Sequence, residues 1–172
     1  MDIFQLEQLD NNIFSANNLD VGSMAVYGGQ VLAQSILAAY KTVEGKSLNS
    51  IHGYFLLMGD NSKPIKYTVT TVRNGRSFDI RRVQAWQDDK NIFIMAASFH
   101  KKEKGLEHQK SMPNVPQPEL LTPYSELFAQ FAEQFQIKPK GFYSKEGPLI
   151  FHPLEKYDPF HPGKKPARTH LW

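Results

Sequence analysis

No charged residue occurs in the stretch Val21-Gly-Ser-Met-Ala-Val-Tyr-Gly-Gly-Gln-Val-Leu-Ala-Gln-Ser-Ile-Leu-Ala-Ala-Tyr40. From about Gly29 onward its Ala, Leu and Gln residues favour a helix, which a basic last turn and Gly45 would end. Apolar side chains occur all round this helix, which is typical of a helix that is buried on every side or lies in a membrane. The uninterrupted apolar run is too short to span a membrane. We therefore expect a central helix surrounded by other structure.

Four segments rich in β-branched and aromatic residues follow this helix, each bounded by turn residues: 51–57, 65–72, 77–87 and 92–99. The pair Asn74-Gly75 lies between two of them and is a strong hairpin signal. Between Ile80 and Val83 the apolar alternation changes phase, which indicates a bulge or a long twisted strand near Arg81-Arg82. The connections are short, so we expect antiparallel neighbours.

One buried helix followed by a long antiparallel meander predicts an α+β hotdog fold, in which a curved sheet wraps a long central helix. A β-sandwich is the competing architecture, but it offers an uncharged helix no buried position. Further along, residues 112–118 contain three prolines and indicate an extended linker. An amphipathic helix is expected at 125–135, with Ser125 as its N-cap. Its apolar stripe consists of Leu127, Phe128, Phe131 and Phe135.

The composition of the 172 residues, 41% hydrophobic and 22% charged, is that of a globular protein and excludes a disordered or collagen-like chain. Without cysteine the chain has no disulfide framework and no thiol nucleophile, which fits a reducing, cytoplasmic compartment. Residues 136–172 carry a net charge of +4 and the first 135 residues carry −1. Because this basic surplus lies in a proline-rich tail, we expect a solvated tail and no nucleic-acid or membrane partner.

Five motifs occur in the order and spacing of a known family: Tyr27-Gly-Gly-Gln30; His52-Gly-Tyr-Phe-Leu56 with Gly59-Asp60; Arg73-Asn-Gly-Arg-Ser-Phe78 with Arg81-Arg-Val83; Ala96-Ala-Ser-Phe99; and Gly105-Leu-Glu-His-Gln109 with Met112-Pro113. On these motifs the chain resembles the acyl-CoA thioesterase II family. The resemblance implies two hotdog repeats in one polypeptide, hydrolysis of fatty acyl-CoA to free fatty acid and CoA, and no metal or redox cofactor. The family's catalytic Asp, Thr or Ser, and Gln lie in its second repeat and match no position here, so none is carried over.

The resemblance also implies an organisation: a hotdog domain at 1–112, a linker with a short amphipathic helix at 113–140, and the beginning of a second hotdog repeat at 141–172. The chain would then be the N-terminal portion of an acyl-CoA thioesterase, catalytically incomplete on its own. One alternative is a non-catalytic hotdog scaffold that forms a homo-oligomer through its sheets or pairs with a complementary half. Another is a self-sufficient hydrolase or dehydratase whose base, Asp60, His52 or Glu107, comes across a dimer interface.

Thioester hydrolysis requires hydrogen-bond donors for a developing oxyanion and a base that activates water. Gly28 and Gly29 at a helix N-terminus would supply donors through unpaired N–H groups, or would only let the helix enter a crowded sheet. Gln30 and Gln34 share one helix face, where they would line an acyl-CoA pocket or satisfy polar groups at a buried interface. From Val21 to Lys41 there is no Asp or Glu, so this helix carries no carboxylate base.

The arginines near the predicted hairpin are candidates for the CoA phosphates, because a guanidinium matches phosphate oxygens. Arg76 is the residue assigned to this role, and Arg73, Arg81 and Arg82 share the chemistry. Cross-strand pairing with acids is the alternative role for all four. No metal site is expected, since the six histidines show no spacing of the His-Glu-x-x-His kind.

Overall fold

The computed structural model describes residues 4–136, 149–155 and 163–172. The chain divides into two compact units, Met1–Leu106 and Glu107–Trp172. Among the described residues no helix is both long enough and apolar enough to cross a membrane.

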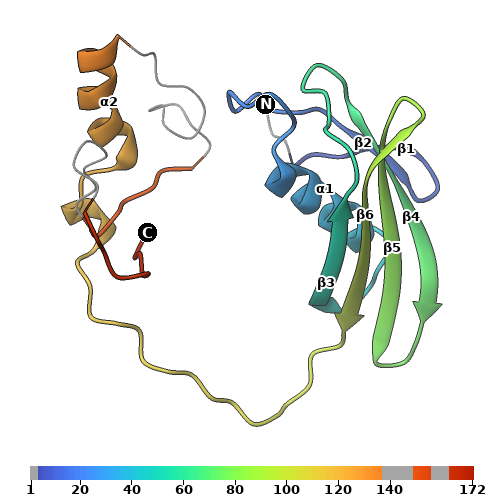
Figure 1. Ribbon diagram of the computed structural model, residues 1–172. Coiled ribbons are helices and arrows are strands. Elements are labelled where there is room, and N and C mark those ends of the chain that lie inside the picture. The colour runs from blue at the N-terminus through green and yellow to red at the C-terminus, as the bar shows by residue number, and fades with distance from the viewer. Residues whose placement is uncertain (1–3, 137–148, 156–162) are drawn as a thin grey trace. The chain divides into compact units, whose positions relative to one another are not determined.

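The first unit contains a six-stranded antiparallel sheet whose strand order is β1-β2-β4-β5-β6-β3 (Figure 1). The strands are β1 (Glu7–Asp10), β2 (Ile13–Ala16), β3 (Ser47–Phe55), β4 (Ile65–Asn74), β5 (Phe78–Gln87) and β6 (Lys90–His100). The four predicted strands are therefore confirmed with small shifts at their ends. The hairpin β1–β2 was not predicted from the sequence, and its turn at Asn12 has a positive φ of 61°.

The position of β3 corrects the expected meander. Among the described strands β3 pairs with β6 alone and forms one edge of the sheet, so it is not a neighbour of β4, the next strand in the sequence. The connection 56–64 must pass the ends of β6 and β5, a distance of about 14 Å at about 4.8 Å between strands. Its nine residues are long enough, because an extended chain spans about 3.3 Å per residue. A short connection in the sequence thus becomes a loop across one end of the sheet.

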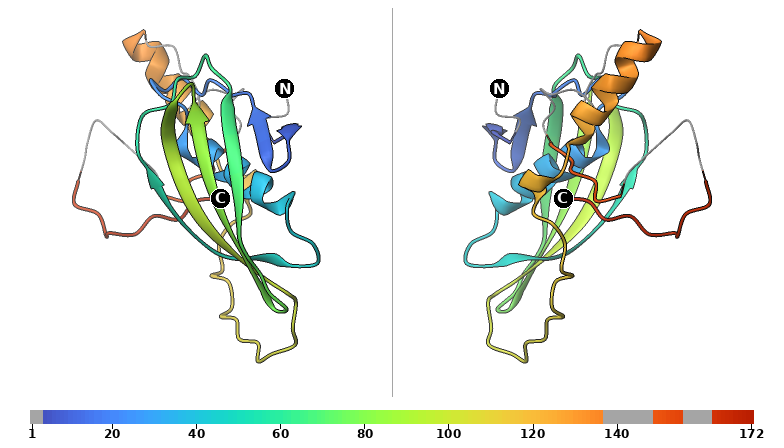
Figure 2. Two further views of the ribbon diagram at one scale, coloured as in Figure 1. Left: turned by 90° about the vertical axis from the view of Figure 1, so that its right-hand side faces the viewer. Right: turned by 90° about the vertical axis from the view of Figure 1, so that its left-hand side faces the viewer.

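The helix α1 (Gly28–Tyr40) lies along one face of this sheet (Figure 2). Its buried residues face the sheet: Gln30, Val31, Gln34, Ser35, Ala38 and Ala39. The other face carries Leu32, Ala33, Ile36 and Leu37, which are only half-buried. The expectation of a helix enclosed on every side is therefore wrong for this face, because a single sheet can cover only one side of a helix.

The expected bulge near Arg81-Arg82 lies in the partner strand instead. On β5 the inward positions alternate without interruption, and Asp79 and Arg81 occupy two of them. The register shift falls on β4, between Thr71 and Arg73, opposite this part of β5. The apolar pattern changed phase because two charged side chains take inward positions, not because β5 bulges.

The second unit is described in part. A 3₁₀ turn at Pro118–Leu120 precedes α2 (Tyr124–Phe135), which confirms the predicted helix. Ser125 is not its N-cap, because the helix already begins at Tyr124 after Pro123. Phe135 is half exposed, and the side chain of Phe131 lies outside the described residues. The chain end pairs with an earlier segment: Pro153 and Leu171 form an antiparallel bridge that hydrogen bonds on both sides extend.

Candidate active site

An apolar cavity of about 400 Å³ opens beside the N-terminus of α1. Two segments form its walls, the chain that leads into the helix and the loop that follows β3. The lining residues are Ala25, Val26, Gly28, Val31, Phe55, Leu56, Leu57, Met58, Gly59 and Ile92. The loop residues carry no motif that marks them as part of a site. The signal available was the run of four apolar residues 55–58, which continues past the end of β3 into the loop.

Gly28, the first residue of α1, lines this cavity, and the first turn of the helix carries unpaired backbone donors. Tyr27 stands at the N-cap in an extended conformation without a side-chain capping bond. The first intrahelical bonds come from the N–H groups of Gln30 and Val31, which donate to the carbonyl of Tyr27 at 3.0 and 3.3 Å. Within the described part of the chain the N–H groups of Gly28 and Gly29 have no acceptor. No acidic residue lies in the first turn, so the positive end of the helix dipole is uncompensated.

Both glycines also make room for aromatic rings. A Cβ atom on Gly28 would lie 3.0 Å from ring atoms of Phe55. A Cβ atom on Gly29 would collide with the ring of Tyr27, whose hydroxyl would be 2.9 Å away. The close packing supports the alternative in which the glycines are present because a side chain would not fit there. It does not engage their N–H groups in hydrogen bonds. The two roles are compatible, and the binding role of Gly28 and Gly29 stays a prediction.

Gln30 and Gln34 are buried and bonded to protein groups. Gln30 accepts a hydrogen bond from the backbone N–H of Leu19 at 3.1 Å and donates to the Asn18 side-chain oxygen at 2.9 Å. The hydroxyl of Tyr67 donates to Gln34 Oε1 at 2.6 Å, and burial raises the pKa of this tyrosine above its usual range. These contacts correspond to the buried-interface alternative, and contact of either glutamine with substrate stays a prediction.

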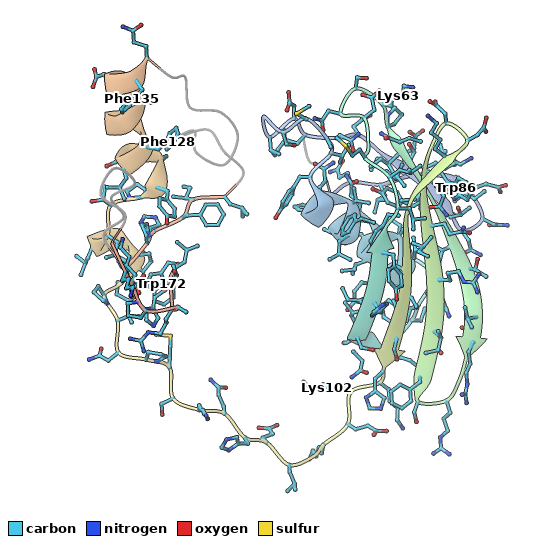
Figure 3. All side chains as sticks on the ribbon, viewed as in Figure 1. Lys63, Trp86, Lys102, Phe128, Phe135 and Trp172 are labelled. Atoms are coloured by element: carbon cyan, nitrogen blue, oxygen red, sulfur yellow. The ribbon has the colours of Figure 1, made fainter. Side chains whose placement is uncertain are left out.

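Arg76 lies at the opposite end of the sheet from the cavity. It is exposed in the β4–β5 hairpin, next to Ser77, whose carbonyl accepts the N–H of Lys101 at 3.1 Å. Figure 3 shows the neighbouring Lys102 at one end of the sheet and Lys63, from the loop 56–64, at the other. On β6 the cavity end is marked by Phe93, which pairs with Phe55, and the hairpin end by His100, which pairs with Phe78. These two residues are seven positions apart, a distance of about 23 Å along the strand. The structure does not bring Arg76 to the helix N-terminus, and its contact with CoA phosphates remains a prediction.

Arg81 has a different environment from the other hairpin arginines. It is 2% exposed, and its guanidinium donates to the carbonyl and the hydroxyl of Thr42, just after α1, at 2.7 and 2.8 Å. It also donates to the carbonyls of Arg73 and Ile80, each at 3.0 Å. The alternation of side chains along β5 could have revealed this burial, because Arg81 lies two residues before Val83 and so points to the same, inward face of the sheet. The arrangement ties the C-terminal end of the helix to the sheet.

The three residues considered as bases lie in separate places. The Asp60 carboxylate accepts bonds from the N–H and the hydroxyl of Ser62, at 2.9 and 2.7 Å, which lower its pKa and stabilise a turn. His52 lies on β3 with its ring 4.9 Å from that of Tyr54. Glu107 is exposed at the start of the second unit. None of the three lines the cavity beside α1.

Comparison with known proteins gives this geometry a context. Residues 17–100 match the model of the acyl-CoA thioesterase N-terminal domain. The chain is 38% identical over 171 residues to acyl-CoA thioesterase 2 of Haemophilus influenzae. The chain belongs to the acyl-CoA thioesterase II family. The match covers 99% of this chain and 60% of the Haemophilus protein. Human acyl-coenzyme A thioesterase 8 is 39% identical over 75% of this chain and 41% of its own length. The chain thus spans about half the length of these family members.

Solved structures support the same fold. Acyl-CoA thioesterase II TesB2 from Mycobacterium marinum aligns with a TM-score of 0.59 and 40% identity over 66% of this chain and 42% of that chain. A hot dog fold protein from Alicyclobacillus acidocaldarius aligns with a TM-score of 0.63 over 72% of this chain and 47% of that chain. The identity to the latter is 20%, so this likeness concerns the fold. The predicted hotdog fold is confirmed for one central helix and a six-stranded antiparallel sheet.

Proposed function

We propose that this chain forms the N-terminal portion of an acyl-CoA thioesterase that hydrolyses fatty acyl-CoA to free fatty acid and CoA. One observation carries the proposal: Gly28, the first residue of α1, lines the apolar cavity, and among the described residues its N–H and that of the adjacent Gly29 have no acceptor. An acyl chain fits apolar walls, and a thioester carbonyl needs donors where its oxygen becomes negative. The family membership supports the same substrate class.

In the proposed reaction, water attacks the thioester carbonyl carbon and a tetrahedral oxyanion forms. The N–H groups of Gly28 and Gly29 donate to this oxyanion, and the helix dipole stabilises its charge. The carbon–sulfur bond then breaks, the acid is released, and the CoA thiolate takes a proton. A base must remove the proton of the attacking water, and among the described residues the cavity lining contains no carboxylate or histidine. We assign that base to residues outside this chain.

Two measurements on the 172-residue chain test whether it binds acyl-CoA but lacks the base for hydrolysis. Steady-state hydrolysis of medium- and long-chain acyl-CoA should be little above the uncatalysed rate. A non-hydrolysable acyl-CoA thioether should nevertheless bind, and Gly28→Val, which places a branched side chain against Phe55, should weaken this binding. Turnover at the level of a complete enzyme would contradict the absence of a base here. Failure of the thioether to bind would contradict the site itself.

A second candidate function is that of a hotdog scaffold that forms a homo-oligomer. β3 is an uncharged edge strand of nine residues without proline, and its one register shift lies near its start, between Leu48 and Ser50. The part from Ile51 to Phe55 therefore lacks the devices that usually protect a sheet edge. Tyr54 and Phe55 on this strand are 58% and 59% exposed. Within the described first unit, one apolar face of α1 is only half-buried. Antiparallel pairing of β3 with β3 of a second copy would cover the edge, and sedimentation that shows only a monomer would contradict it.

Two further parts of the proposal concern the organisation of the protein. We propose that residues 141–172 begin a second hotdog repeat. Within the described residues the pairing of 152–154 with 170–172 is the feature that supports this assignment. We also propose a cytoplasmic location, which the cysteine-free composition supports. A fluorescent fusion of the full chain in its own cells would test the location.

A further inference from the structure

Two side-chain amides, those of Gln87 and Asn18, meet at the turn that ends the loop after β3. Gln87, the last residue of β5, is 6% exposed, and its Nε2 donates to the carbonyls of Asp60 and Lys63, each at 2.8 Å. The N–H of Asp60 donates back to Gln87 Oε1 at 2.7 Å. Asn18 Nδ2 donates to the same two carbonyls from the other side, at 2.5 Å to Lys63 and 3.4 Å to Asp60.

Gln30 connects this turn to the helix. Its Nε2 holds Asn18 Oδ1 at 2.9 Å, which fixes the orientation of the Asn18 amide, so that Nδ2 faces the turn. The three amides therefore form one chain of bonds from α1 through residue 18 and the turn to β5. We call Asn18, Gln30 and Gln87 the amide network. In each of the three amides the nitrogen donates a hydrogen bond and the oxygen accepts one, as polar groups removed from water require.

The loop that the amide network holds is also a wall of the cavity. Residues 56–59 line the cavity directly, and the turn 60–63 continues the same loop. The Gly59 carbonyl accepts the N–H of Val26 at 3.0 Å, which joins the two walls. A Cβ atom on Gly59 would lie 3.0 Å from Val26 and 3.3 Å from Gln87 Oε1, so wall and network are in contact there. The position of the turn therefore determines the position of the wall.

We infer that Asn18 and Gln87 are positioning residues for acyl-CoA binding: they hold the loop 56–63 against the helix N-terminus, so that its apolar residues and Gly28 line one cavity. The inference rests on the proposed function for the identity of the ligand. The mechanical part, that the two amides hold the loop, stands on the contacts alone. Neither residue lines the cavity, so both act through the loop.

Isosteric variants of the full 172-residue chain test the inference. Gln87→Met keeps the length and volume of the side chain and removes its three bonds to residues 60 and 63. Asn18→Asp keeps the acceptor for Gln30 and places a carboxylate against two carbonyls, at a part-exposed position that tolerates the change. Gln84→Met is the matched control, because Gln84 lies on the same strand, faces the opposite side of the sheet and has no part in the network.

Two readouts separate positioning from a general contribution to folding. Hydrogen exchange should become at least about tenfold faster for the amides of 56–63 in Gln87→Met and Asn18→Asp, and stay unchanged in Gln84→Met. The dissociation constant of a non-hydrolysable acyl-CoA thioether should rise about tenfold in the same two variants, at a temperature where all are folded. A residue that only stabilised the fold would leave the affinity of the folded protein unchanged.

The outcomes are distinct. Unchanged exchange in 56–63 would overturn the inference, and so would faster exchange with the wild-type affinity retained. If the wild-type chain does not bind the thioether, the proposed function fails, and exchange alone then decides whether the amides hold the loop. If Gln87→Met does not fold, Asn18→Asp carries both measurements.

Discussion

Arg81 illustrates what a buried charge does in this fold. Its guanidinium has no carboxylate partner at hydrogen-bond distance among the described residues and instead donates to the carbonyls and hydroxyl around it, two of them at the end of α1. The carbonyl end of a helix carries partial negative charge, so a cation is favourable there. The side chain thereby fixes the helix to β5 at the end remote from the cavity.

Arg81→Met should lower the free energy of unfolding by about 2–4 kcal/mol, because it leaves several carbonyls without donors in the core. The adjacent Arg82→Met, on the exposed face of the same strand, should change it by no more than about 0.5 kcal/mol. Urea unfolding monitored by the fluorescence of Trp86 measures both. Equal effects of the two variants would contradict the assigned role.

Asp79 contributes a pH dependence. It is 4% exposed and accepts a bond from the Lys46 ammonium at 2.8 Å, and this partner, with the N–H of Gly75, lowers the pKa of Asp79. Because the folded-state pKa lies below the unfolded value of about 4, the stabilisation is complete above pH 4. It is lost as the pH falls through the folded-state pKa.

The measurement compares wild type with Asp79→Asn in urea unfolding from pH 7 to pH 3. The wild type should be more stable at pH 7 and at pH 5 by the same margin, and this margin should shrink below pH 4. A margin that stays constant down to pH 3 would show that the carboxylate of Asp79 contributes nothing as an anion.

At the scale of elements, the edge strand β3 and the half-buried face of α1 leave apolar surface uncovered. Edge strands of stable monomers usually carry charge, proline or a bulge in their exposed part. The one irregularity of β3 lies near its start, between Leu48 and Ser50, and the rest pairs regularly with β6. The exposed ladder of Ile51–Phe55 is thus suited to another strand.

Tyr54→Lys should weaken self-association about tenfold, because it places a charge in the proposed β3–β3 contact. Thr70→Lys is the control, since it adds the same charge on the same sheet face in the interior strand β4 and should leave association unchanged. Analytical ultracentrifugation over a range of concentrations gives both constants. A similar effect of the two substitutions would indicate charge repulsion in general and not pairing of β3.

At the scale of the whole molecule, the chain joins two units through a segment with little structure. Residues 102–114 are exposed throughout and belong to no helix or strand. The first unit contains the sheet, α1, the cavity and the amide network, and its core consists of its own side chains. We expect it to keep its structure when the connection to the second unit is cut.

Brief trypsin digestion should therefore cleave first among the lysines of the segment, which are Lys102, Lys104 and Lys110. The expected product begins at Met1 and ends at one of them, and its circular dichroism should retain the strand signal. Mass spectrometry identifies the ends. Degradation without any intermediate of this size would show that the first unit depends on the second.

The sequence determined the elements. The uncharged run from Val21 to Tyr40 specified a helix, Asn74-Gly75 specified a hairpin, and both follow from local preferences of backbone and side chain. Five short motifs were enough to indicate the family. Local patterns also placed the two glycines at the start of the helix, where their N–H groups have no partner within the helix.

The tertiary structure decided what these elements do together. Strand order is a matter of long-range pairing, and only that pairing moved β3 to the edge and drew the loop 56–63 across the sheet end beside α1. Hydrogen bonds between residues far apart in the chain, such as Gln87 with Asp60, leave no periodic trace in the sequence. The cavity wall and the amides that hold it therefore became visible only when the chain was folded.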